Sequence, residues 1–255
     1  MEADFRQTEG PQGAGASGVR AVTRALGLLS ALGGQGRTLT EMAAAVDVSL
    51  STASRLLATL KMAGYVDQSP DGLWGPGAAL TALLHRTDRW AGVRPVAGQA
   101  VRALRDDLDE TVGFFVLVGA ERLCLESAEC GRPVRRVVTP GERGPAFLGA
   151  AGKALLAFCE DRPDDLGLPG GTFTTATGTT RTREELRAEL AEIAAKGSAF
   201  SSLETTQESW SVAVPVRIAG RVAGALATVV PATRTEPGYI AFITQRTVAA
   251  ARGIS

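Results

Sequence analysis

The side chains best suited to bind another molecule lie near the start of residues 49–66, the stretch SLSTASRLLATLKMAGYV. Small hydroxyl groups and one guanidinium group gather there, whereas leucines recur at helical spacing along the stretch. A guanidinium group can donate two hydrogen bonds to the edge of a guanine, and hydroxyl groups can bind bases or phosphates. The pattern predicts a helix with one apolar face toward a core and a polar face that contacts DNA. The polar residues are Ser51, Thr52, Ser54 and Arg55.

Groups able to catalyse a reaction or hold a metal are few. His85 is the only histidine, so a Ser-His-Asp, Cys-His or histidine-containing zinc site would need it. It lies in ALLHRTDRW, a predicted helix without an adjacent nucleophile. The string GAAGK departs from a phosphate-binding loop, because Phe147 and Ala154 occupy positions where that motif needs glycine and a hydroxyl residue. These residues predict a protein that is not an enzyme and has neither a cofactor nor a metal site.

Composition is typical of a globular protein. The chain has 255 residues, with 45% apolar residues, 21% charged residues and a formal net charge of zero. No apolar run approaches the ~18 residues that span a bilayer, and the N-terminus lacks the pattern of a signal peptide. Three cysteines without a CxxC pair fit a reducing compartment. We expect a cytoplasmic protein without a membrane partner, with a disordered tail over residues 1–17.

Residues 18–77 have the order of a winged helix-turn-helix domain. A first helical pattern is broken by GGQGR and restarts at TLTEMAAAV, where either Thr38 or Thr40 caps the helix. The stretch described above follows as the third helix and ends at Gly64, and YVDQSPDGLW predicts a short hairpin. In such domains the second helix of the pair enters the major groove. The residues expected to face the core are Val19, Val22, Leu26 and Leu29 in the first helix and Leu50, Ala53, Leu57 and Leu60 in the third.

Charge favours more than one DNA-binding unit. Residues 17–80 contain five basic and four acidic residues, whereas phosphate neutralisation dominates affinity for DNA. A single copy would bind weakly, and two copies on one operator would bind more tightly. A small helical subdomain with solvated serines is the alternative.

The remainder of the chain combines helices with short apolar strands. A helical pattern over residues 77–108, interrupted near Pro95, precedes strands at 111–119, 122–129 and 134–139. GAAGKALLAFC predicts a helix, after which a loop rich in Pro, Gly and Thr extends to Arg181. A capping box of Thr182 and Glu185 starts a helix that ends at Gly197. Strands at 198–205, 210–218 and 221–230 and a final helix over 238–252 follow. Helices flanking one largely antiparallel sheet define an α+β fold.

Several collinear strings together resemble the IclR family of bacterial transcriptional regulators. SGVRAVTRALGLLSAL is similar to the family's first helix, SLSTASRLLATLKMAGYV to its recognition segment and DGLWGPG to its wing. PGERGPAFLGAAGKALLAF and KGSAFSSLETTQESWSVAVPVRIAGRVAGALATVVPATR are similar to its two C-terminal patterns. The resemblance covers nearly everything after Ser17.

The resemblance implies three parts: a winged helix-turn-helix domain at 18–77, a linker helix at 78–94, and a GAF/PAS-like α+β domain at 95–255 for effector binding and oligomerisation. It also implies homodimers, usually paired into tetramers, that bind double-stranded operator DNA and respond to a small organic effector. The alternative is a small-molecule-binding or oligomerisation module without sequence-specific DNA binding. The residues expected to contact DNA are Thr40, Ser49, Ser51, Thr52, Ser54, Arg55 and Lys61.

The resemblance places an effector pocket between the sheet and the helix that begins at GAAGK. Backbone amides from Gly149 to Gly152 would suit a carboxylate, because a helix start favours an anion. Phe147 stands where the family often has His, and the family's Glu-Glu pair appears as Leu203-Glu204. We therefore expect an apolar pocket with few charges for a small organic acid or a phenolic compound; in the alternative, its hydroxyl groups only satisfy the backbone. The residues expected to bind the effector are Phe147, Gly149, Ala150, Ala151, Ser201, Ser209, Ser211, Thr228 and Val230.

Overall fold

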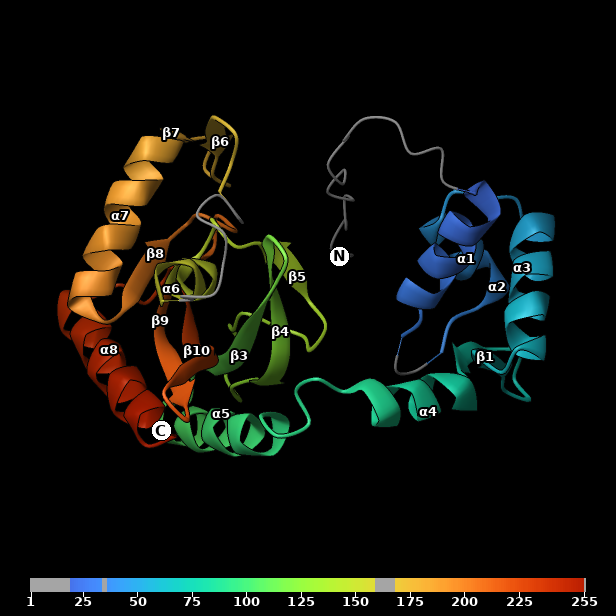
Figure 1. The fold of residues 1–255 in the computed structure, drawn as a ribbon, viewed down its shortest axis with the longest axis horizontal. Coiled ribbons are helices and arrows are strands. Elements are labelled where there is room, and N and C mark those ends of the chain that lie inside the picture. Colours follow the sequence, from blue (N-terminus) through green and yellow to red (C-terminus); the bar gives the residue numbers. More distant parts are fainter. Residues whose placement is uncertain (1–18, 34–35, 159–167, 255) are drawn as a thin grey trace. The chain divides into compact units, whose positions relative to one another are not determined.

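The computed structural model describes residues 19–33, 36–158 and 168–254. The tail predicted at 1–17 and Cys159 lie outside the described residues. The chain divides between Arg89 and Trp90 into two compact units (Figure 1). We call the part up to Arg89 the first unit and the part from Trp90 the second unit.

Capping residues set where the helices of the first unit begin and end. The Thr38 hydroxyl accepts a hydrogen bond from the Glu41 amide, and the Glu41 carboxylate accepts one from the Thr38 amide at 2.8 Å. Thr38, rather than Thr40, is therefore the cap. Gly64, at φ 75°, turns the chain into the hairpin as predicted. The elements are α1 (Arg20–Ser30), α2 (Leu39–Ala45), α3 (Leu50–Met62), β1 (Val66–Gln68), β2 (Trp74–Pro76) and α4 (Ala78–Thr87).

The core of the first unit differs from the predicted one in α1. Val22 and Leu26 are 55% and 58% exposed, whereas Leu28 is fully buried. The reason is a close approach at Gly27, where an added Cβ would lie 2.9 Å from Val46 Cγ1. This approach turns the Leu28 side of α1 toward α2 and α3. The prediction that Val19, Val22 and Leu26 face the core is therefore wrong, and so is that for Leu50, which is 51% exposed.

The second unit is built on one six-stranded antiparallel sheet with the strand order β5-β4-β3-β10-β9-β8. Two more short strands, β6 and β7, pair separately as a hairpin. The elements are α5 (Arg94–Leu108), β3 (Thr111–Val118), β4 (Glu121–Ala128), β5 (Arg143–Pro145), α6 (Ala150–Phe158), β6 (Thr172–Thr174), β7 (Thr180–Thr182), α7 (Arg183–Lys196), β8 (Ala199–Ser202), β9 (Ser209–Ile218), β10 (Arg221–Pro231) and α8 (Pro237–Arg252).

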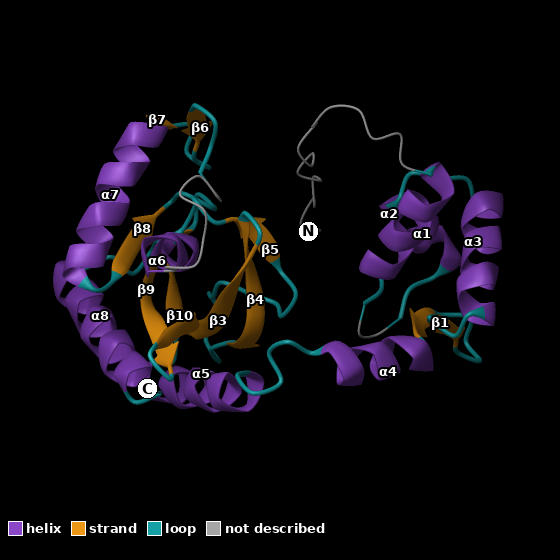
Figure 2. Ribbon diagram, in the orientation of Figure 1, coloured by secondary structure: helices purple, strands orange, loops and turns teal. Residues whose placement is uncertain are grey.

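Alternation along the strands gives the sheet two apolar faces. Figure 2 shows the strands of this sheet with helices α5, α6, α7 and α8 around them. Helices α5 and α8 cover the face that carries Phe114 and Leu226. Helix α6, with α7 packed beside it, covers the face that carries Phe115 and Ala227. This arrangement of helices on an antiparallel sheet is the predicted α+β architecture.

Three details of the second unit and its entry correct the predictions. Residues 134–139 form an irregular segment rather than a strand, and the loop expected before Arg181 contains the β6–β7 hairpin. The predicted linker helix at 78–94 is helical only to Thr87. The helical pattern is interrupted at 88–93, near Pro95 as predicted, and Pro95 itself lies in the first turn of α5, where its missing N–H costs nothing. Among the described residues, no helix combines the length and apolarity needed to cross a bilayer.

Candidate DNA interface and ligand cavity

Hydroxyl groups organise the first turn of α3. Ser49 is the N-cap, and its hydroxyl oxygen accepts a hydrogen bond from the Thr52 amide at 3.3 Å. The same hydroxyl group lies 3.1 Å from the Ser51 hydroxyl and 2.9 Å from that of Thr52. Two of the residues predicted to contact DNA, Ser49 and Thr52, therefore also fix the start of the helix. Ser51 remains exposed at that start.

The exposed side of α3 presents the remaining polar residues. Ser54 and Arg55 are exposed, and within the described ranges no carboxylate forms an ion pair with Arg55. Thr40, on α2, is exposed as well. Lys61 lies in the last turn of α3, where its Nζ is 6.0 Å from the centre of the Trp74 ring on the wing. Arg55 thus projects from α3 with its five donors available to an outside acceptor.

The second unit contains a cavity of about 40 Å³ between the sheet and the start of α6. Its walls come from β3, β4, β8, β9 and β10, from the segment after β4, and from the first turn of α6. Six of the nine residues predicted to bind an effector line this cavity. They are Gly149, Ala150, Ala151, Ser201, Ser209 and Ser211.

Three predicted effector residues do not line the cavity. The Phe147 ring packs against Phe173 with 5.0 Å between the ring centres. Thr228 and Val230 lie on the opposite face of the sheet, where the Thr228 hydroxyl is 2.8 Å from that of Thr247 on α8. Because side chains alternate along a strand, a shift of one position moves a residue to the other face. The cavity is lined instead by Ala227 and Val229.

Charged residues line the cavity that the sequence predicted to be apolar. Arg122 of β4 and Arg136 and Glu142 of the segment after β4 contribute to its wall. Burial lowers the pKa of the Arg122 guanidinium; Glu142 opposes this effect and Arg136 adds to it. These residues were missed because arginines scattered along a strand and a loop carry no spacing signal. Only the sheet register brings Arg122 to this face.

The first turn of α6 is held by a buried ionic network. Lys153 is fully buried, and its Nζ donates to Glu189 Oε1 on α7 at 2.6 Å and to the Glu204 carboxylate. Glu204 Oε2 in turn accepts a hydrogen bond from the Gly149 amide at 3.0 Å. One of the amides expected to bind a carboxylate is therefore already occupied. The amides available to a ligand begin at Ala150.

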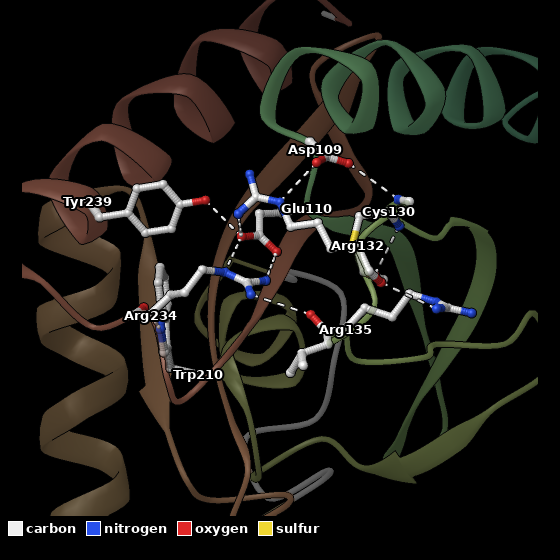
Figure 3. A network of polar contacts seen from close by, with 11 residues as sticks. Asp109, Glu110, Cys130, Arg132, Arg135, Trp210, Arg234 and Tyr239 are labelled. Atoms are coloured by element: carbon white, nitrogen blue, oxygen red, sulfur yellow. Dashed lines mark hydrogen bonds and ion pairs between the residues drawn. The ribbon is translucent and has the colours of Figure 1, made fainter.

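A second network anchors the segment that carries Arg136 (Figure 3). Glu110 is fully buried and accepts hydrogen bonds from Arg234 Nε and Nη2 at 2.7 and 2.6 Å and from the Tyr239 hydroxyl at 2.7 Å. Burial, together with the hydrogen bond to Glu110, raises the pKa of Tyr239 to about 12. Arg132 Nη1 lies 3.4 Å from Glu110 Oε1. Glu110 thus fixes the residues just before Arg136.

A winged helix-turn-helix unit with an exposed polar α3, joined to a separate α+β unit, defines a DNA-binding transcriptional regulator. The model of the IclR helix-turn-helix domain matches residues 21–70, and that of the bacterial transcriptional regulator IclR C-terminal domain matches residues 85–255. The chain belongs to the IclR family. It is a transcriptional regulator of that family, not an enzyme.

Individual relatives extend over most of the chain. The HTH-type transcriptional regulator BhcR of Paracoccus denitrificans is 30% identical over 246 residues, which cover 93% of this chain and 87% of that protein. The structure of an IclR transcriptional regulator from Alicyclobacillus acidocaldarius has a TM-score of 0.71 and 25% identity, covering 93% of this chain and 98% of that one. An IclR homologue from Microbacterium hydrocarbonoxydans, complexed with 4-hydroxybenzoate, has a TM-score of 0.69 and 23% identity, covering 92% and 97%.

Proposed function

We propose that α3 reads the sequence of a double-stranded operator and that the chain acts there as a homodimer or a tetramer. The observation that carries this proposal is the exposed side of α3. Its first turn is fixed by the Ser49 hydroxyl, and Arg55 projects from the following turn without an ion pair among the described residues. Such a helix can place a guanidinium group against a guanine edge in the major groove.

The cavity in the second unit is the proposed effector site. Its polar wall, with hydroxyl groups from Ser201, Ser209 and Ser211 and a helix start at Ala150, suits a small organic acid or a phenolic compound. The effector alters operator binding only if it binds the DNA-competent and the incompetent arrangements with different affinity. A change from 1:99 to 99:1 requires a difference of about 5.5 kcal/mol. Residues 88–93 connect the units in sequence and give a path for this coupling.

Arg55→Ala tests the DNA part of the proposal. The wild-type protein is titrated against labelled DNA from immediately upstream of its own gene, with random DNA as competitor, and binding is followed by fluorescence anisotropy. A lost guanine contact is expected to weaken binding by about 1–3 kcal/mol, or roughly 5- to 150-fold, while the far-ultraviolet circular dichroism stays unchanged. Affinity for random DNA is expected to fall much less.

Arg143→Ala is the matched control, because Arg143 is exposed, carries the same charge and lies in the second unit. It is expected to bind the operator as tightly as the wild type. Unchanged affinity in Arg55→Ala would contradict the role assigned to Arg55. Binding by the wild type that random DNA fully displaces would favour the alternative, an effector-binding or oligomerisation module without sequence-specific DNA binding.

A further inference from the structure

The cavity holds two arginines that the proposed function does not yet use. We propose that its effector is a short-chain dicarboxylate, with one carboxylate at the start of α6 and the other bound by Arg122 and Arg136. This inference rests on the proposed function for the place where the effector binds. Beyond the proposed function, it specifies the charge and the size of the ligand.

The position of the Arg122 guanidinium is built into the fold. Its Nη1 donates a hydrogen bond to the Pro145 carbonyl oxygen at 3.3 Å. A Cβ added to Gly144 would lie 2.2 Å from the same nitrogen, so Gly144 leaves the room that the guanidinium group occupies over β5. Only one of the five donors of Arg122 has an acceptor in the described ranges. The others can serve a ligand.

The two cavity arginines differ from their neighbours in having no paired carboxylate. Arg234 and Arg132 share Glu110, and Arg143 is 2.7 Å from Glu121. Within the described residues, neither Arg122 nor Arg136 has a carboxylate oxygen within 4 Å, although Glu142 lines the same wall. Two like charges in a partly buried site repel each other. A bound carboxylate would remove this cost and can accept hydrogen bonds from a guanidinium fork.

The opposite wall provides a second place for an anion. The first turn of α6 presents the amides of Ala150 and Ala151 at the positive end of the helix dipole, and Ser201 and Ser211 add hydroxyl donors. Both walls therefore attract negative charge, whereas Glu142 is the one carboxylate among the cavity-lining residues described. A monocarboxylate can neutralise one wall only, but a dicarboxylate matches both.

The volume of the cavity sets the size of the ligand. About 40 Å³, at roughly 10–15 Å³ for each enclosed water, is room for about three water molecules. A short diacid and a phenolic compound are each larger than about three water molecules, so the walls must move apart to admit either of them. A rigid aromatic ring requires more movement than a flexible acid of a few carbons. The cavity therefore favours a short aliphatic diacid over a phenolic compound.

Isothermal titration calorimetry on the full-length protein tests this inference with matched probes. Succinate is compared with butanoate and glutarate with pentanoate, so that each pair differs by one carboxylate. The dicarboxylate is expected to bind at least about tenfold more tightly than its partner, as a charge-assisted bidentate contact allows. Arg122→Gln and Arg136→Gln are each expected to remove most of this difference, because either change takes away part of the site for the second carboxylate. Arg143→Gln, the matched control, is expected to keep the full difference between dicarboxylate and monocarboxylate affinity.

The outcomes separate this inference from the proposed function. Equal affinity of succinate and butanoate, or a preference that survives both arginine substitutions, would overturn the dicarboxylate assignment. Absence of binding by all four acids would overturn it too, and operator binding by the same preparation would then show that the DNA-reading part stands. Arg122→Lys keeps the charge but loses the fork, so it is expected to bind succinate with intermediate affinity; it serves as the test if Arg122→Gln does not fold.

Discussion

Glu110 anchors the segment that leads to Arg136 in the cavity wall. It is fully buried, yet its carboxylate accepts hydrogen bonds from Arg234 and Tyr239 and forms an ion pair with Arg132. Arg234 also donates to the Val134 carbonyl oxygen at 3.3 Å, two residues before Arg136. Loss of the Glu110 carboxylate would leave Arg234 without its counter-charge, whereas Arg132 would keep Asp109 at 2.9 Å. Breaking a buried pair in this way costs more than the pair itself contributes.

Glu110→Ala is expected to lower the free energy of unfolding of the second unit by about 3 kcal/mol. This value is at the low end for a broken buried ion pair, because Arg132 and Arg234 are both partly exposed. Urea denaturation followed by circular dichroism measures this. Glu121→Ala removes a carboxylate from the exposed pair with Arg143 and is expected to cost less than about 1 kcal/mol. Equal losses in the two variants would show that Glu110 is not an anchor.

Residues of the candidate site were predictable where they followed a recognisable string. Ser209 and Ser211 alternate with Trp210 and Val212 along β9. The resemblance therefore predicted correctly that both serines lie on the face that lines the cavity. The predictions for Thr228 and Val230 were wrong by one position, because nothing in the sequence of β10 marks which face of the strand meets α6. Arg122 could not be found either, since β4 joins β3 through a register shift between Phe114 and Phe115 that no sequence pattern announces.

At the scale of elements, caps were the most reliable signals. The Thr182–Glu185 capping box and Gly197, at φ 79°, start and end α7 as predicted. Such signals are local, because a side chain and an amide three residues away decide them. The buried side of α1 is not local, because it depends on how closely Gly27 approaches Val46. Periodicity alone placed Leu29 against the core correctly, and Val19, Val22 and Leu26 wrongly. The β6–β7 hairpin, in a stretch without apolar alternation, gave no strand signal.

The cap of α2 gives a matched pair of variants. Thr38→Ala removes the hydroxyl that holds the Glu41 amide and is expected to destabilise the first unit by about 1 kcal/mol. Thr40→Ala is expected to stay within about 0.5 kcal/mol, because Thr40 is an exposed residue of the helix. Thermal unfolding measures both changes. A larger loss in Thr40→Ala would contradict the cap assignment.

The same cap predicts a dependence on pH. The hydrogen bonds from the Thr38 amide and hydroxyl lower the pKa of Glu41. A lowered carboxyl pKa means that this stabilisation is complete above the unfolded pKa and is lost as the pH falls through the lower, folded pKa. The difference in stability between Thr38→Ala and the wild type is therefore expected to shrink in acid.

At the scale of the whole molecule, the small net charge of each first unit limits its affinity for DNA. Five basic and four acidic residues between positions 17 and 80 give one copy little attraction for phosphates. We expect two first units on one duplex, with half-sites one helical turn, about 10 base pairs, apart. Sedimentation of the protein–DNA complex and footprinting measure the stoichiometry and the spacing. Full affinity for a single half-site by one chain would contradict this expectation.

Because of the strand order in the second unit, some neighbouring strands can pair only late in synthesis. Phe115 of β3 pairs with Ala225 of β10, 110 residues later in the chain. A ribosome that adds 5–20 residues per second leaves the inner edge of β3 without its partner for roughly 6–20 s. The first unit ends at Arg89 and needs no later strand, so it can fold while the rest is still being made. During that interval β3 and β4 are the part of the nascent chain most in need of protection from aggregation.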